Sequence, residues 1–140
     1  MKGFTLIELL VVVSIIGILI GLSIFGLQGA RESSRDARRK ADLEVVRSGL
    51  EIYRSDCNSY PDSITFGGSL VGNDPGNDGC DGNTYISQVP ADPIDPSRTY
   101  FYSSDGVTYE LCSALEQDPV SSATCIGSCT ETCNYKVVNP

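Results

Sequence analysis

The sequence predicts an α+β fold in which one long N-terminal α-helix packs on a small antiparallel β-sheet with disulfide-stapled loops. Three observations support this prediction. The chain reads as one uninterrupted helix to about residue 56, β-rich runs appear only near residue 99 and beyond, and all six cysteines follow the helix. With 140 residues and 41% hydrophobic side chains, the chain has room for one membrane segment and one small domain, and a larger architecture is excluded.

The first element is a helix over residues 4–29 that is long and apolar enough to span a membrane. Roughly 20 apolar residues cross the hydrocarbon core of a bilayer. A secretory signal peptide would have a shorter apolar centre and a small-residue cleavage site, whereas this run continues into a charged helix. Gly17 and Gly21 have the spacing of a helix-packing face, although glycine is common in membrane helices generally. The polar residues between Phe4 and Leu27 are Thr5, Glu8, Ser14 and Ser23.

Glu8 places a carboxylate one turn into this apolar run. An ionised side chain in hydrocarbon is costly, so such a residue usually has a partner or a function, and its most obvious partner is an amine. The alternative is that Glu8 lies close enough to the membrane interface to stay hydrated. The sequence leaves both interpretations open.

Residues 30–56 are predicted to continue the helix as an amphipathic segment. The stretch from Ala30 to Arg54 contains no proline and one glycine, and it is rich in strong helix formers. A helix over residues 4–56 would be roughly 80 Å long, far more than a small domain can cover, so its N-terminal half must project. The apolar residues that recur on one face at spacings of three and four are Leu43, Val46, Leu50 and Tyr53.

Residues 57–140 are predicted to form a globular head. The stretch from Gly67 to Asn83 has the composition of a long loop. β-rich composition then predicts three strands, at residues 99–102, 107–111 and 134–138.

A β-hairpin is predicted where Asp105-Gly106 separates the first two of these strands, because this dipeptide is a strong turn signal. One face of the sheet is expected to pack on the apolar stripe of the helix. That face should bury Phe101, Leu111 and some of the tyrosines. So small a sheet would be marginally stable by itself, and helix packing and disulfides must contribute.

Six cysteines lie in the head, and their even number in a small loop-rich unit favours disulfides and an oxidising exterior. The alternative is a zinc site at the three C-terminal cysteines, but structural zinc sites use close cysteine pairs, often with histidine, and the chain has no histidine. Fifteen pairings are open, although Cys57 with Cys80 would close the segment after the helix. The cysteines are Cys57, Cys80, Cys112, Cys125, Cys129 and Cys133.

The net charge of −8 is distributed unevenly. Residues 31–47 hold six basic and four acidic groups, whereas residues 48–140 hold three basic and thirteen acidic groups. The acidic head would repel phosphates, so no nucleic-acid partner is expected. The basic residues after the apolar run favour a cytoplasmic head by the positive-inside tendency, but the cysteines favour the outside, and we give them more weight.

The sequence lacks the residues and motifs that are typical of catalytic sites. It has no histidine, no Gly-x-Ser-x-Gly elbow and no phosphate-binding loop, and its acidic pairs lie in turn-rich loops. We therefore expect no catalytic residues and no enzymatic activity.

The segment Lys2-Gly3-Phe4-Thr5-Leu6-Ile7-Glu8 resembles the processing motif of the type IV prepilin family, which includes pilus subunits and type II secretion pseudopilins. The shared features are a short basic leader, a glycine before the scissile bond, a phenylalanine after it, and a glutamate five residues into the mature chain. The resemblance implies a pilin-like fold. Tyr60-Pro61, Asp92-Pro93 and the hairpin at Asp105-Gly106 resemble the major pseudopilins in particular.

The resemblance implies that residues 1–3 are a leader peptide and that a prepilin peptidase cuts between Gly3 and Phe4. The same enzyme would N-methylate Phe4. Glu8 would then pair with the Phe4 amine of a neighbouring subunit and set the axial offset during assembly.

A member of this family would be a structural subunit of a type IV pilus or of a secretion pseudopilus, and the sequence leaves open which. Its partners would be further copies of itself in a helical filament, other pilins, the peptidase and an assembly platform protein. It would span the inner membrane once, with its N-terminus inside and its head outside, before joining a cell-surface or periplasmic filament. The alternative is a membrane-anchored extracellular disulfide-rich binding module that keeps Met1.

The resemblance also implies a calcium ion in the C-terminal loops, but the residues there offer no full cage of oxygen ligands. Residues 74–79 resemble an EF-hand loop only superficially, and Asp92 with Asp95, or Glu116 with Asp118, would supply two carboxylates each. We therefore expect hydrated acidic loops stapled by disulfides, without a metal or another cofactor.

Overall fold

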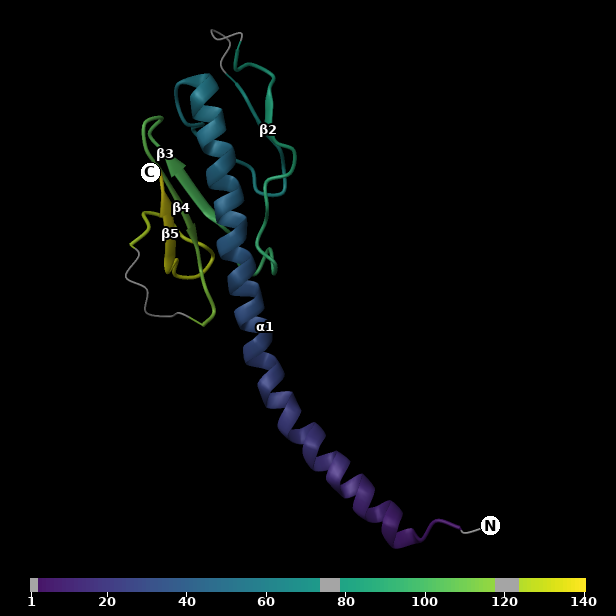
Figure 1. The fold of residues 1–140 in the computed structure, drawn as a ribbon. Coiled ribbons are helices and arrows are strands. Elements are labelled where there is room, and N and C mark those ends of the chain that lie inside the picture. Colours follow the sequence, from purple (N-terminus) through teal and green to yellow (C-terminus); the bar gives the residue numbers. More distant parts are fainter. Residues whose placement is uncertain (1–2, 74–78, 118–123) are drawn as a thin grey trace.

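The computed structural model describes residues 3–73, 79–117 and 124–140 and consists of one long helix with two small antiparallel sheets gathered around its C-terminal half (Figure 1). The helix, α1, comprises the 52 residues Leu6–Cys57, which confirms the predicted continuous helix. Its N-terminal half projects from the head in a gentle curve, as its length requires (Figure 1).

Both ends of α1 are capped by residues that are typical of helix termini. Thr5 is the N-cap in an extended conformation, and its side chain accepts a hydrogen bond from the Glu8 backbone N–H. Asn58 adopts a left-handed conformation with φ of 61°, and its N–H donates to the Arg54 carbonyl. No proline lies between these caps, so the ladder of backbone hydrogen bonds runs unbroken from the apolar segment to the head.

The larger sheet confirms the predicted hairpin and the third strand. It has the order β3-β4-β5, and each strand begins one or two residues later than predicted. Asp105 shapes the turn between the first two strands because its carboxylate accepts the backbone N–H groups of Val107 and Thr108. The strands are β3 (Phe101–Ser104), β4 (Tyr109–Ser113) and β5 (Tyr135–Val138).

The smaller sheet pairs β1 (Leu70–Val71) with β2 (Thr84–Ile86) and was not predicted. The prediction of one long loop across residues 67–83 was therefore wrong at β1. A strand of two residues has no periodic pattern to read. β1 forms because of a tertiary contact: Leu70 lies opposite Ile86, and both side chains are buried in the core.

The main core lies between the apolar stripe of α1 and the inner faces of the two sheets. The helix contributes the predicted residues Leu43, Val46, Leu50 and Tyr53, which are all buried. Two buried tyrosines have paired hydroxyls, since Tyr100 donates to Asp42 and Tyr60 donates to Glu51, each at 2.9 Å. The other buried apolar members of this core are Cys57, Tyr60, Leu70, Cys80, Ile86, Val89, Tyr100, Tyr109, Leu111 and Val137.

Phe101 does not face the helix, contrary to the prediction. It pairs with Cys112, whereas Tyr102 pairs with Leu111, and successive strand residues point to opposite faces. Because Leu111 faces the main core, Phe101 and Cys112 must face outward. They form a second cluster on the outer face of the sheet with Ala114, Cys125, Cys129 and Cys133.

Three disulfides join all six cysteines, as Cys57–Cys80, Cys112–Cys125 and Cys129–Cys133. The first closes the segment directly after the helix, the one pairing that the sequence analysis named without being able to choose it over the others. The second ties the C-terminal loop onto the outer face of β4. Gly127 in this loop lies so close to the Phe101 ring that a Cβ atom would overlap it. Helix and loop thus cover the two faces of the sheet, and no cysteine is left for a zinc site.

Candidate assembly and processing site

The apolar half of α1 is uncovered by any other part of the described chain. The 18-residue apolar window in this helix is 0% buried, and the helix is long and apolar enough to cross a membrane. Leu6 is 81% exposed and Leu22 69%. A continuous apolar surface of this kind marks a membrane or protein contact rather than a face left in water.

The two serines of this segment satisfy their hydroxyls inside the helix. Ser14 donates to the Leu10 carbonyl at 2.8 Å, and Ser23 donates to the Leu19 carbonyl at 2.9 Å. Such bonds to the preceding turn hide the hydroxyl from lipid. The polar groups of both serines are thus satisfied within the helix, and Glu8 is the one charged residue of the apolar segment.

Glu8 is held by Thr5 in a reciprocal capping box. Glu8 Oε2 accepts hydrogen bonds from the Thr5 backbone N–H at 3.0 Å and from Thr5 Oγ1 at 2.7 Å, while the Glu8 N–H donates to Thr5 Oγ1 at 3.3 Å. The carboxylate thus lies at the N-terminus of α1, where the helix dipole favours negative charge. Our sequence reasoning missed the role of Thr5, although Thr-x-x-Glu is the sequence signature of this cap.

Gly3 and Phe4 directly precede the N-cap Thr5. This end of α1 is the one that projects away from the head (Figure 1). Phe4 is 81% exposed, and a Cβ atom at Gly3 would meet nothing within 4 Å. The same open space surrounds Gly17 and Gly21. The three residues named for processing and assembly therefore lie at the projecting end of α1, and the described chain leaves the small-residue face of the helix uncovered.

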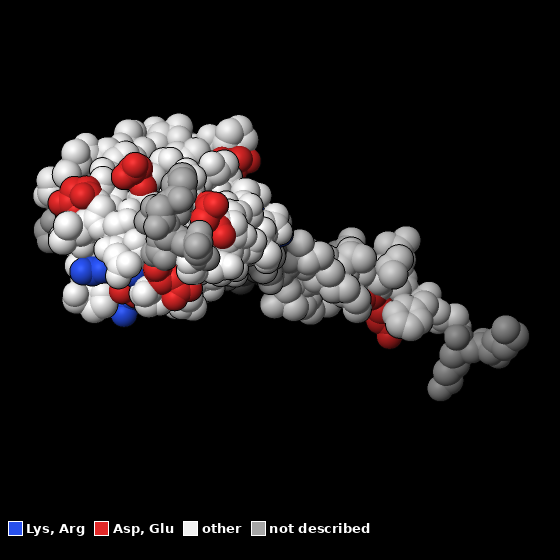
Figure 2. Space-filling model, turned by 90° about the horizontal axis from the view of Figure 1, so that it is seen from above, with Lys and Arg blue, Asp and Glu red and all other residues white. Residues whose placement is uncertain are grey.

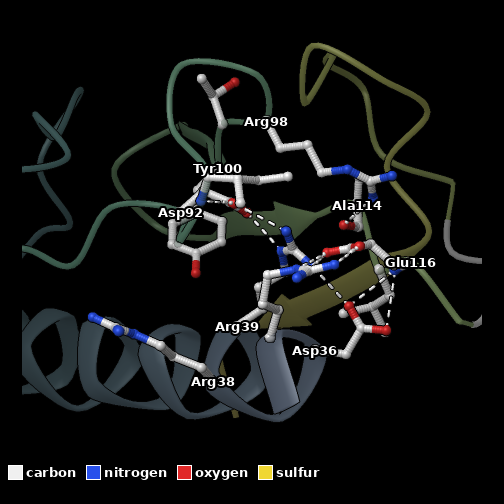
Figure 3. Close-up of polar contacts among 12 residues, drawn as sticks. Asp36, Arg38, Arg39, Asp92, Arg98, Tyr100, Ala114 and Glu116 are labelled. Carbon is white, nitrogen blue, oxygen red and sulfur yellow. Dashed lines mark hydrogen bonds and ion pairs between the residues drawn. The ribbon is translucent and has the colours of Figure 1, made fainter. Parts of the chain in front are cut away.

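An ion-pair cluster clamps the head to the helix just beyond the apolar segment (Figure 3). Its centre is Arg39, whose side chain has no solvent exposure. Arg39 Nε and Nη2 donate to the two carboxylate oxygens of Asp92 at 2.7 and 3.0 Å, and Nη1 donates to Asp36 at 2.8 Å and to Glu116 at 2.7 Å. Burial by itself would lower the pKa of Arg39, but these hydrogen bonds outweigh it and raise the pKa.

The segment after β4 completes this clamp. Arg35 donates to both carboxylate oxygens of Glu116. The hydrogen bond from Arg35, with support from Arg39, lowers the pKa of Glu116 to about 2. Asp36 accepts the backbone N–H groups of Glu116 and Gln117, and Gln117 Nε2 donates to the Gly29 carbonyl at 2.7 Å. The head is therefore bonded to α1 directly after the apolar segment.

These contacts correct the expectation of hydrated acidic loops. The Asp92 side chain is 0% exposed and that of Glu116 is 12% exposed, so neither is a solvated surface carboxylate. Asp95 is exposed, in agreement with the expectation, whereas residue 118 and most of the 74–79 loop lie outside the described residues. Elsewhere the visible face of the head carries mainly acidic groups with few basic ones (Figure 2).

Comparison with protein families matches both halves of the chain. Residues 1–24 match the prokaryotic N-terminal methylation motif. Residues 27–122 match type II secretion system protein G, which covers more than half of the chain. The boundary between the two matches falls close to the end of the exposed apolar segment.

Curated relatives agree with the family match. The type II secretion system core protein G of Dickeya chrysanthemi is 31% identical over 76% of this chain and 79% of its own length. The protein of the same name from Escherichia coli K12 is 30% identical over 81% of this chain and 80% of its own length. No solved structure matches the chain. An exposed apolar helix with a methylation motif, joined to a head that matches protein G, shows that this chain belongs to the type II secretion system protein G family, the structural pseudopilin subunits of that system.

Proposed function

We propose that prepilin peptidase cuts this chain between Gly3 and Phe4 and methylates the new Phe4 amine, and that residues 4–29 then assemble the subunit into a periplasmic pseudopilus. The observation that carries the proposal is the 18-residue apolar window of α1, which is 0% buried and lies in the helix that starts at a matched methylation motif. Such a helix can be stored in a membrane and later buried against other copies. Residues 30–56 then carry the head, residues 57–140, on the filament surface.

Glu8 directs this assembly by pairing with the Phe4 amine of a neighbouring subunit. Within one subunit, Thr5 bonds to Oε2 of Glu8, and Oε1 has no hydrogen-bond partner among the described residues. Cleavage after Gly3 creates a positive amine at Phe4 that this carboxylate can neutralise in a low-dielectric filament core. Removing one partner of a buried ion pair costs about 3–5 kcal/mol, so the pair strongly favours a single axial offset.

Two substitutions separate the charge of Glu8 from its capping role. Glu8→Gln keeps a side chain that suits the capping box but removes the charge, whereas Thr5→Val removes the hydroxyl and keeps the charge. We expect membrane insertion and cleavage of both variants, with filament yield greatly reduced for Glu8→Gln and near normal for Thr5→Val. Sheared filament fractions and electron microscopy would measure yield. Normal yield from Glu8→Gln would refute the pairing.

Processing is tested directly by mass spectrometry of the mature protein. The expected product lacks residues 1–3 and carries one methyl group on Phe4. Gly3→Val should block this processing without disturbing the fold, because the space around Gly3 is open. An N-terminus that still starts at Met1 in the wild type would favour the anchored binding module instead.

We expect the N-terminus to lie in the cytoplasm and the head in the periplasm. Three disulfides in the head support an oxidising compartment. Arg35 and Arg39, two of the basic residues that favour a cytoplasmic head, are used in ion pairs with head carboxylates. In this location the assembly platform protein and other pseudopilins would be the partners of the helix.

A second copy of the chain is the expected occupant of the exposed face of α1 within the head. Val45 and Ile52 are 51% and 55% exposed. They lie seven residues apart, about two helical turns, and therefore share one face. Leu27, eighteen residues or about five turns before Val45, lies on the same face and is 53% exposed. Between Leu27 and Val45 this face carries the exposed polar residues Ser34 and Arg38, so the apolar patch at Val45 and Ile52 is separate from the apolar assembly segment.

A further inference from the structure

The ion-pair cluster around Arg39 is arranged like a metal-binding site, but the positive charge at its centre is the Arg39 guanidinium. Carboxylates converge on one guanidinium from three separate segments: Asp36 from α1, Asp92 from the connection between β2 and β3, and Glu116 from the segment after β4 (Figure 3). A bound metal ion commonly links distant loops in this way. Here the link is a side chain of the helix itself.

The guanidinium has little capacity left for further partners. Four of its five N–H groups are directed at carboxylate oxygens at distances between 2.7 and 3.0 Å. Arg39 and Asp92 form a two-bond pair with fork geometry, and neither side chain has any solvent exposure. Paired charges of this kind are stable in a buried site only when their hydrogen bonds are satisfied, as they are here.

The charges of the cluster nearly balance without a metal. Two guanidinium groups, of Arg35 and Arg39, face three carboxylates, which leaves one excess negative charge. Backbone N–H groups of residues 94, 116 and 117 donate to Asp92 and Asp36 and spread that charge. The carboxylate oxygens that a divalent cation would need as ligands already accept hydrogen bonds from these N–H groups.

Calcium therefore does not fit the carboxylates of this cluster. It requires six to eight oxygen ligands at about 2.3–2.6 Å. Both oxygens of Asp92 and both oxygens of Glu116 already accept N–H groups from Arg35 or Arg39. Calcium could enter only by displacing a buried guanidinium and leaving it unpaired, which is strongly unfavourable.

We propose that Arg39 is the internal cation of this head, so that the clamp between head and helix forms without calcium. Arg39 fills a cradle of three carboxylates, and its removal would convert the cradle into a site that needs a cation. The proposal concerns the folded subunit by itself and is independent of cleavage and filament assembly.

The first test is thermal unfolding of the full-length subunit in detergent micelles. Samples in a chelator and in millimolar calcium chloride at equal ionic strength are compared by circular dichroism. The same melting temperature is expected in both. A saturable rise of several degrees in calcium would overturn the proposal, and this measurement does not require any variant to fold.

The second test removes the guanidinium. Arg39→Ala should lower the melting temperature by about 10 °C or more in chelator, because buried carboxylates lose their partner. Calcium should restore part of this loss, and the further substitution Asp92→Asn should abolish the restoration. Arg38→Ala is the matched control, since Arg38 points away from the cluster and is 69% exposed (Figure 3).

Two results in the second test would contradict the proposal. One is an unchanged melting temperature for Arg39→Ala, which would mean that the guanidinium does not hold the clamp. The other is a destabilised Arg39→Ala variant that does not respond to calcium, which would mean that the three carboxylates form no cation cradle.

Discussion

The exposed face of α1 should contribute to filament assembly and not to the stability of a single subunit. The perturbation is the double substitution Val45→Ser and Ile52→Ser. Both side chains are about half exposed in the isolated subunit, at 51% and 55%, so about half of each can still be buried by a second copy. Neither belongs to the buried core around Leu50.

The magnitude follows from the area that remains to be buried. Complete burial of a valine or isoleucine side chain is worth about 1.5–3 kcal/mol, so half burial of two such residues is worth about 1.5–3 kcal/mol per contact. This free energy corresponds to a reduction of about 10- to 100-fold in the association constant. Because every subunit of a filament repeats the contact, the yield of long filaments should collapse.

The assay compares filament yield with monomer stability. Sheared filaments are quantified after production of the variant, and thermal unfolding of the same protein is measured in detergent micelles. Val107→Ser is the matched control, because Val107 is 65% exposed at the hairpin turn, away from the helix. Wild-type filament yield from the double variant would refute the assignment, and so would a loss that Val107→Ser reproduces.

Two further predictions concern the head. In Gly49→Ala, the higher helix propensity of alanine should add about 1 kcal/mol to the free energy of unfolding, but overlap of the new Cβ with the buried Ile86 side chain should remove about 1–3 kcal/mol. The substitution should therefore destabilise the wild type, and it should stabilise an Ile86→Ala background in which the overlap is absent. Denaturant unfolding of the four proteins in this cycle measures the coupling, and equal effects in both backgrounds would exclude the overlap. The pKa of Glu116 is lowered from 4.5 to about 2, so its stabilising contribution of up to about 3 kcal/mol is complete above pH 4.5 and is lost as the pH falls towards 2. Melting temperatures between pH 7 and pH 2 should fall less steeply for Glu116→Gln than for the wild type across this interval, and parallel curves would contradict the prediction.

Local patterns in the sequence predicted the helix and the turn of the hairpin. The stripe at Leu43, Val46 and Leu50 is readable because a helix repeats every 3.6 residues over a long stretch. Asp105 identifies the turn because its side chain bonds to the adjacent backbone. The role of Thr5 was also readable from the Thr-x-x-Glu spacing, and its omission was a failure of interpretation.

The strand β1 and the orientation of Phe101 could not be read in this way. β1 exists because Leu70 reaches the same core as Ile86, which is a contact between distant residues. Phe101 faces outward because the register pairs it with Cys112, and a shift of one residue would reverse the face. Registers and short strands are properties of the packed chain.

By itself, the sequence determined the long helix, the exposed apolar segment and the motif around Gly3, Phe4 and Glu8, because each depends on neighbours within a few residues. Only the tertiary structure decided which cysteines pair and which carboxylates are buried. Asp36, Asp92 and Glu116 are separated by up to 80 residues, and only folding brings them to the guanidinium of Arg39. From the sequence alone, a charged residue is expected at the surface. It can be buried only when folding brings an oppositely charged partner to it from a distant segment.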